Sequence, residues 1–150
     1  MIRDQIAEYI RILRFSQNMV DNSMNLGSLK EQQYFLNLLQ LEVEHRETIR
    51  IQRLIKNAGF YSMKSFDNFI FDDINMPSGI DSRYLSSCEF IEEKRNFVFY
   101  GNTGTGKTHL AQAIGLEACK KGMNVKFYRT AALVNKQKKK KKSRDLSVFM

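Results

Sequence analysis

Residues 96 to 108 read NFVFYGNTGTGKT, and this stretch decides the fold that we expect for the chain of 150 residues. Its first five residues are a short run rich in strand formers, typical of a buried parallel strand. The next eight match the pattern G-x-x-x-x-G-K-[ST] without a mismatch. A buried strand that leads directly into this pattern predicts a P-loop, or Walker A motif, which binds the phosphates of a nucleotide.

The residue types in the loop suit a triphosphate for separate physical reasons. Gly101, Gly104 and Gly106 permit backbone angles that a side chain would forbid, so successive N–H groups can point at phosphate oxygens. The Lys107 ammonium is expected to reach the β- and γ-phosphates, next to the positive end of the following helix. The Thr108 hydroxyl is the expected ligand of a magnesium ion. The expected cofactors are therefore ATP and Mg²⁺.

The chain after the loop predicts the remainder of a βαβ unit. Apolar residues recur at helical spacing from Leu110 to Cys119, and this helix should end near Gly122. Residues 124–128 predict a second strand, and Thr130 is the expected cap of one more helix. The predicted fold class is α/β, with an incomplete parallel sheet of the P-loop NTPase type.

The chain before the loop predicts helices. Apolar residues from Ile2 to Val20 follow one helix face, which predicts a first helix to about residue 23. Ser28 and Glu31 form a capping-box pattern that should begin a second helix, and Gly59 should end it. This part of the chain therefore predicts a small all-helical domain.

Four parts of the chain follow from these elements. The only proline, Pro77, marks a connection, and Asp81 is expected to cap a third helix that runs to about Glu93. The expected parts are a helical N-terminal domain at 1–60, a connecting segment at 61–80, a partial ATPase core at 81–135 and a lysine-rich tail at 136–150.

The net charge of +8 is concentrated in the tail. Residues 136–150 hold seven basic residues and one acidic residue, so they carry six of the eight net charges. We expect this run to be solvated and disordered, as blocks of like charge usually are. Lysine runs bind polyanions through counterion release, so a contact with DNA here would be independent of sequence.

Other classes of protein find little support in the sequence. No apolar run reaches the roughly 20 residues that cross a bilayer, so we expect a cytoplasmic protein without membrane contact. Cys88 and Cys119 are expected to be buried, reduced thiols, because their spacing suits neither zinc nor a disulfide framework. His45 should lie on a charged helix face, and His109 should be an ordinary, partly exposed helix residue.

Hydrolysis by a P-loop protein also needs a Walker B motif, an acidic strand end that holds magnesium and orients water. No such element follows the loop in the sequence. Asp72 and Asp73 precede the loop, and the residues that follow them do not resemble a Walker B motif. Asp145 has its apolar residues after it rather than before. Neither Arg129 nor Arg144 can be assigned as an arginine finger. The sequence therefore predicts nucleotide binding and assigns no catalytic residue.

The sequence resembles the IstB-like ATP-binding proteins, which assist the transposases of insertion sequences. The resemblance rests on NFVFYGNTGTGKTHLAQAIGLEACKKGMNVKFYRTAALVN at 96–135 and on LLQLEVEHRETIRIQRLIKNAGFYSMKSFDNFIF at 38–71. Many families share the P-loop, whereas KTHLAQAIGLEACKKG and the upstream charged helix are more specific. About residues 5 to 135 are covered.

The resemblance implies an AAA+ ATPase core behind a small helical domain, DNA binding, and ATP-dependent assembly of the full-length protein into a homo-oligomer. Family members continue into the second acidic motif, the sensors and the arginine finger, so we expect this chain to be a truncated member. Residues after Asn135 are either a lysine-rich version of the family's next helix or altered coding. The nucleotide contacts implied within the loop are Gly101, Asn102, Thr103, Gly104, Thr105, Gly106, Lys107 and Thr108.

Three functions are compatible with these patterns. The first is an ATP-binding helper of transposition that acts with a transposase and DNA and does not hydrolyse ATP as this chain alone. The second is a DnaC-like loader of a replicative helicase. The third is a non-catalytic fragment whose helical part binds a protein and whose lysine tail binds DNA.

Overall fold

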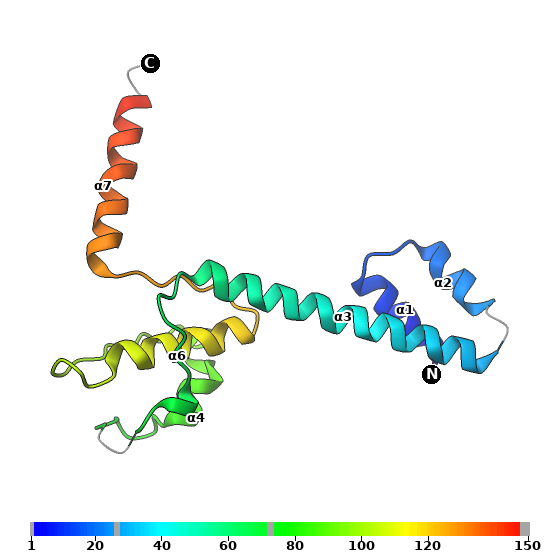
Figure 1. Cartoon of the computed structure of the whole chain (residues 1–150), viewed down its shortest axis with the longest axis horizontal. Coiled ribbons are helices and arrows are strands. Elements are labelled where there is room, and N and C mark those ends of the chain that lie inside the picture. The colour runs from blue at the N-terminus through cyan, green and yellow to red at the C-terminus, as the bar shows by residue number, and fades with distance from the viewer. Residues whose placement is uncertain (1, 26–27, 72–73, 148–150) are drawn as a thin grey trace. The chain divides into compact units, whose positions relative to one another are not determined.

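The computed structural model describes residues 2–25, 28–71 and 74–147. It divides into two compact units, unit 1 at residues 1–52 and unit 2 at residues 53–150. Figure 1 shows the helices along the chain from blue to red. In chain order they are α1 (Ile2–Ile12), α2 (Gln17–Met24), α3 (Leu29–Ala58), the 3₁₀ helix η1 (Phe66–Asn68), α4 (Ser82–Ser87), α5 (Glu89–Glu92), α6 (Lys107–Lys120) and α7 (Thr130–Ser147).

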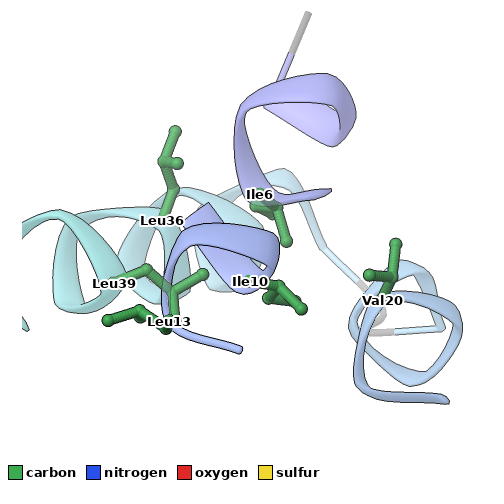
Figure 2. Close-up of a cluster of buried hydrophobic side chains, with 6 residues drawn as sticks. All are labelled: Ile6, Ile10, Leu13, Val20, Leu36 and Leu39. Carbon is green, nitrogen blue, oxygen red and sulfur yellow. The ribbon is translucent and has the colours of Figure 1, made fainter. Parts of the chain in front are cut away.

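Unit 1 has a core of aliphatic side chains. Each of its helices presents apolar residues at a spacing of three or four, which places them on one face. Figure 2 shows the six buried side chains that α1, α2, α3 and the turn after α1 contribute, namely Ile6, Ile10, Leu13, Val20, Leu36 and Leu39. The helical N-terminal region that the sequence predicted therefore has a core of its own.

The first predicted helix is in fact two helices. The prediction ran it from residue 2 to about 23, but α1 ends at Ile12 and α2 begins at Gln17. Arg14 has a φ of 60°, and the Phe15 amide donates to the Ile10 carbonyl at 3.0 Å. The resulting turn allows Val20 to reach the same core as α1.

Helix α3 begins and ends where the sequence predicted. The Ser28 amide donates to Glu31 Oε2 at 2.8 Å, and the Glu31 amide donates to Ser28 Oγ at 3.3 Å, so the capping box is confirmed. Gly59 follows the last residue of the helix with a φ of 79°, as a C-terminal cap requires.

In unit 2, α4, α5 and α6 surround a mixed core. Leu85, Phe90, Leu110 and Ile114 are buried there, with further aromatic side chains packed against them. Asp81 caps α4 as predicted, because its Oδ1 accepts from the Tyr84 amide at 2.7 Å. The predicted helix to Glu93 is divided, however, because the backbone at Cys88 is left-handed with a φ of 58°.

Neither predicted strand is a strand in the described part of the chain. Phe97 and Phe99 pack into the core of unit 2, whereas Val98 between them is 84% exposed and Tyr100 after them is 93% exposed. This alternation suits a strand, yet a strand also needs a hydrogen-bonded neighbour. The described residues give residues 96–100 no such neighbour, so the parallel sheet of the predicted fold class is not observed there.

The second predicted strand, residues 124–128, is held by the end of α3 instead. The Phe127 amide donates to the Ala58 carbonyl at 2.7 Å, and Lys126 Nζ donates to the Asn57 carbonyl at 2.5 Å. These carbonyls have no partner within a helix because the helix stops there. The segment therefore caps a helix rather than joining a sheet.

The lysine-rich segment also differs from its prediction. Helix α7 runs from Thr130 to Ser147, through the lysine run that was expected to be disordered. Lysine has a high helix propensity, so a run of lysines does not by itself end a helix. Among the described residues, no helix combines the length and apolar character needed to span a membrane.

Candidate nucleotide-binding loop

The predicted loop lies at the start of α6. Gly106 is the N-cap of this helix, and its carbonyl accepts the first helical bond from the Leu110 amide at 2.9 Å. The free amides of a helix start, together with the helix dipole, favour an anion at this position. In Figure 1, α6 is the yellow-green helix beside α4, which it contacts.

The glycines of the loop have the backbone angles that the sequence predicted for them. The φ angles are 145° at Gly101, 90° at Gly104 and 78° at Gly106, a region that disfavours residues with a side chain. A Cβ added at Gly106 would also lie 2.7 Å from Cε2 of Phe69, whereas one at Gly104 would meet nothing within 4 Å. Gly106 is therefore constrained both by its angle and by a neighbour.

The Lys107 ammonium lies against the loop that precedes it. Its Nζ donates to the Asn102 carbonyl at 2.6 Å and to Thr105 Oγ1 at 3.2 Å. Thr105 Oγ1 in turn donates to the Asn102 carbonyl at 2.9 Å. The structure thus brings these three predicted site residues together, with the positive charge held close to the loop backbone.

The remaining predicted residues lie around this group. Thr103 and Thr108 are exposed, and Thr108 belongs to the first turn of α6, where its side chain is accessible from solvent. Its carbonyl accepts from Gln112 Nε2 at 3.4 Å. The exposure of Thr108 beside Lys107 suits a metal ion that also binds a phosphate on the loop.

A residue next to the loop has a contact that the sequence did not predict. His109 is half-buried, as expected, but its Nε2 lies 2.8 Å from the Ser65 carbonyl oxygen. Its ring also meets the ring of Phe69 edge to face, with 5.0 Å between centroids. The partners are 40 or more residues away in the chain, so no local pattern signals this contact.

The two cysteines and the other possible metal ligands show no sign of a functional site in the described residues. Cys88 and Cys119 are free and buried, as predicted, and burial raises the pKa of both thiols. The described residues contain no cluster of three or more His, Cys, Asp or Glu side chains that could hold a metal. Asp72 and Asp73, the two acidic residues that precede the loop, lie outside the described residues.

The chain is similar to a known protein family over most of its length. The family model described as IstB-like ATP binding protein matches residues 12–148. The chain belongs to this family. The match includes the loop, α6 and most of the helical region before it, so the resemblance seen in the sequence is confirmed.

Several curated proteins are similar to this IstB-like chain. The Insertion sequence IS232 putative ATP-binding protein of Bacillus thuringiensis subsp. berliner is 32% identical over 89% of the chain and 54% of its own length. The Insertion sequence IS5376 putative ATP-binding protein of Geobacillus stearothermophilus is 35% identical over 69% of the chain and 41% of its own length. The chain thus spans about half the length of these relatives.

A third relative carries a different name. The Chromosomal replication initiator protein DnaA of Mycoplasma genitalium is 30% identical over 77% of the chain, which corresponds to 25% of that protein. The chain is therefore similar both to proteins named for insertion sequences and to a protein named for replication. The P-loop NTPase fold follows from the family, while the sheet itself is not observed in the described residues.

Proposed function

We propose that this IstB-like protein binds ATP together with Mg²⁺ through the loop Gly101–Thr108 and serves DNA transposition as an ATP-binding helper. The observation that carries the proposal is the Lys107 ammonium, held at 2.6 Å from a loop carbonyl directly at the start of α6. A cation beside the loop, a helix start and a glycine-rich backbone together suit a triphosphate. The names of the insertion-sequence relatives support the biological role.

Each loop residue has a role in this proposal. The amides from Asn102 to Lys107 donate to phosphate oxygens, and the ammonium of Lys107 balances the charge of the terminal phosphates. The exposed Thr108 hydroxyl would be a ligand of Mg²⁺. We assign no catalytic residue, because no Walker B motif or arginine finger can be recognised in the sequence. Hydrolysis by this chain alone is expected to be negligible.

The decisive test compares two lysines of the same helix. Mg-ATP binding to the full chain would be measured by calorimetry for the wild type, Lys107→Ala and Lys120→Ala. Lys120 lies at the other end of α6 and bonds Glu117 at 2.7 Å, so its removal changes the net charge equally without touching the loop. We expect at least about tenfold weaker binding for Lys107→Ala, because a charge-assisted hydrogen bond is lost, and little change for Lys120→Ala. Equal affinities in all three proteins would refute the proposal.

Hydrolysis is tested in the same preparations. The release of phosphate from ATP should be indistinguishable from a protein-free control. Turnover that disappears in Lys107→Ala would show that the chain is a complete ATPase and would overturn this part of the proposal.

The proposed role in transposition also implies partners for the chain. We propose a transposase and DNA as partners, assembly into a homo-oligomer at full length, and a cytoplasmic location. DNA binding through the lysine run would be independent of sequence and would fall steeply with salt. Replacing residues 138–142 with glutamine and measuring DNA affinity at two salt concentrations tests this. Unchanged DNA affinity would mean that another part of the chain contacts DNA.

A second candidate is a role in replication, as a helper of a replicative helicase. The match to a chromosomal replication initiator protein favours it, since that match covers 77% of the chain. Co-purification of the tagged chain with either a replicative helicase or a transposase separates the two candidates.

A further inference from the structure

The contact between His109 and Ser65 suggests a role beyond the loop itself. We propose that His109 is a positioning residue for the nucleotide-binding loop: by donating to the Ser65 carbonyl, it seats the Phe69 ring against Gly106. This inference rests on the proposed function and deepens it, because it names a residue that controls nucleotide affinity from outside the loop.

The hydrogen bond fixes what His109 can do. Its Nε2 lies 2.8 Å from the Ser65 carbonyl oxygen, and a carbonyl can only accept. Nε2 must therefore carry a hydrogen atom that it donates to the protein. That nitrogen is committed to the backbone of a distant segment and is not available to a phosphate.

The same bond places an aromatic ring. Ser65 immediately precedes η1, and the Phe69 amide closes this turn by donating to the Phe66 carbonyl at 3.1 Å. The rings of Phe69 and His109 then meet edge to face, 5.0 Å apart. His109 thus holds both ends of the short segment from Ser65 to Phe69 against the first turn of α6.

Phe69 in turn occupies the space beside Gly106 that a side chain would fill. The nearest ring carbon would lie 2.7 Å from a Cβ at this glycine. Gly106 has a φ of 78° and begins the helix whose first amides are expected to bind phosphate. A backbone that is already confined loses less entropy when a ligand binds, which favours affinity. The contact should therefore order the loop in advance.

The first measurement is the Mg-ATP dissociation constant of the full chain with two substitutions at one position. His109→Leu keeps the approximate size but removes the donor, and it should weaken binding about fivefold, the effect of one ordinary hydrogen bond. His109→Gln retains an N–H that can reach the carbonyl and should bind within about twofold of the wild type. Failure of glutamine to restore affinity would contradict the inference.

Two controls separate this result from its alternatives. Ile114→Val removes one methyl group from the buried face of α6, so it should lower stability without changing affinity. If it weakens binding as much as His109→Leu does, a general loss of stability explains both, and the positioning role is wrong. Lys107→Ala is measured beside them: if it abolishes binding while His109→Leu does not weaken it, only this inference fails.

A second readout needs no nucleotide. The Phe69 ring shifts the NMR signals of Gly106 through its ring current, so the Gly106 amide reports whether the ring is in place. We expect His109→Leu to move this signal in the same direction as Phe69→Leu does, and His109→Gln to leave it near the wild-type position. An unmoved Gly106 signal in His109→Leu would overturn the inference even if the loop bound no nucleotide.

Discussion

Unit 1 builds its core from aliphatic side chains on helices, whereas unit 2 combines helices with aromatic side chains from segments that are neither helix nor strand. In unit 1 the helix period alone brings Ile6 and Ile10 to one face. In unit 2 the rings of Phe90 and Phe97, 4.7 Å apart, join a helix to residues 96–100. The first kind of core is specified locally, and the second depends on partners that are distant in sequence.

The largest effect that we expect in either unit comes from Ile10→Ala. This side chain is 2% exposed within α1, so its loss leaves a cavity and should lower the free energy of unfolding of unit 1 by about 4 kcal/mol. Denaturation followed by circular dichroism measures this. Ile12→Ala, on the same helix but 54% exposed, is the matched control and should cost well under half as much. If Ile10→Ala also weakens Mg-ATP binding, the two units are not independent.

The next effect concerns the glycines of unit 2. Gly106→Ala should lower the unfolding free energy by about 3 kcal/mol, because it adds a clash with Phe69 to the strain of a left-handed backbone. Gly104→Ala has the strain without the clash and should cost about half of that. Thermal unfolding of the two variants compares them. Equal losses would mean that Phe69 does not confine the loop.

Smaller effects are expected from one helix cap in each unit. Ser28→Ala removes the cap of α3, and Asp81→Ala removes the carboxylate that accepts from the Tyr84 amide. Each change should cost about 1 kcal/mol, because one helix amide loses its partner. Urea unfolding of both variants tests whether the units depend on their caps to the same degree. A negligible loss for Asp81→Ala alone would show that α4 is held by its packing.

The smallest effect should appear only at alkaline pH and only in unit 2, which holds both cysteines. Burial raises the pKa of Cys119 above its ordinary value of 9.0. Below that pH the thiol is protonated in both states, so stability does not change. Above it the unfolded thiol ionises first, which favours unfolding until the folded thiol ionises as well. Cys119→Ala should therefore lose less stability than the wild type as the pH rises above 9.0. If the stability of the wild type and of Cys119→Ala falls equally at alkaline pH, this expectation is wrong.

The sequence predicted the helices well because their signals are local. The capping box at Ser28 and the cap at Asp81 each involve residues three positions apart, and both are observed. The breaks at Arg14 and Cys88 were missed, since both have left-handed angles that no glycine or proline announces. The two predicted strands are not observed in the part of the chain that the structure describes, for a different reason: an apolar run indicates burial, but a strand exists only beside another strand.

The candidate site shows the same contrast between local features, which the sequence predicts, and contacts between distant segments, which it does not. The pattern of glycines predicted the left-handed angles of the loop, because a positive φ is a property of single residues. The contact of His109 with Ser65 could not be predicted, because it joins segments that only the fold brings together. Nor could the placement of Phe69 over Gly106, although the phenylalanine lies within the stretch that carries the family resemblance.

The hydrogen bonds of Lys107 have a consequence for selectivity. Because its ammonium already donates to Asn102 and Thr105, an arriving ligand competes with two oxygen acceptors of the protein. A group with a single weak acceptor gains nothing from this exchange, since it replaces two partners with one. A terminal phosphate brings several charged oxygens and can more than replace both. We therefore expect Lys107 to favour ligands of high charge density over weakly charged ones.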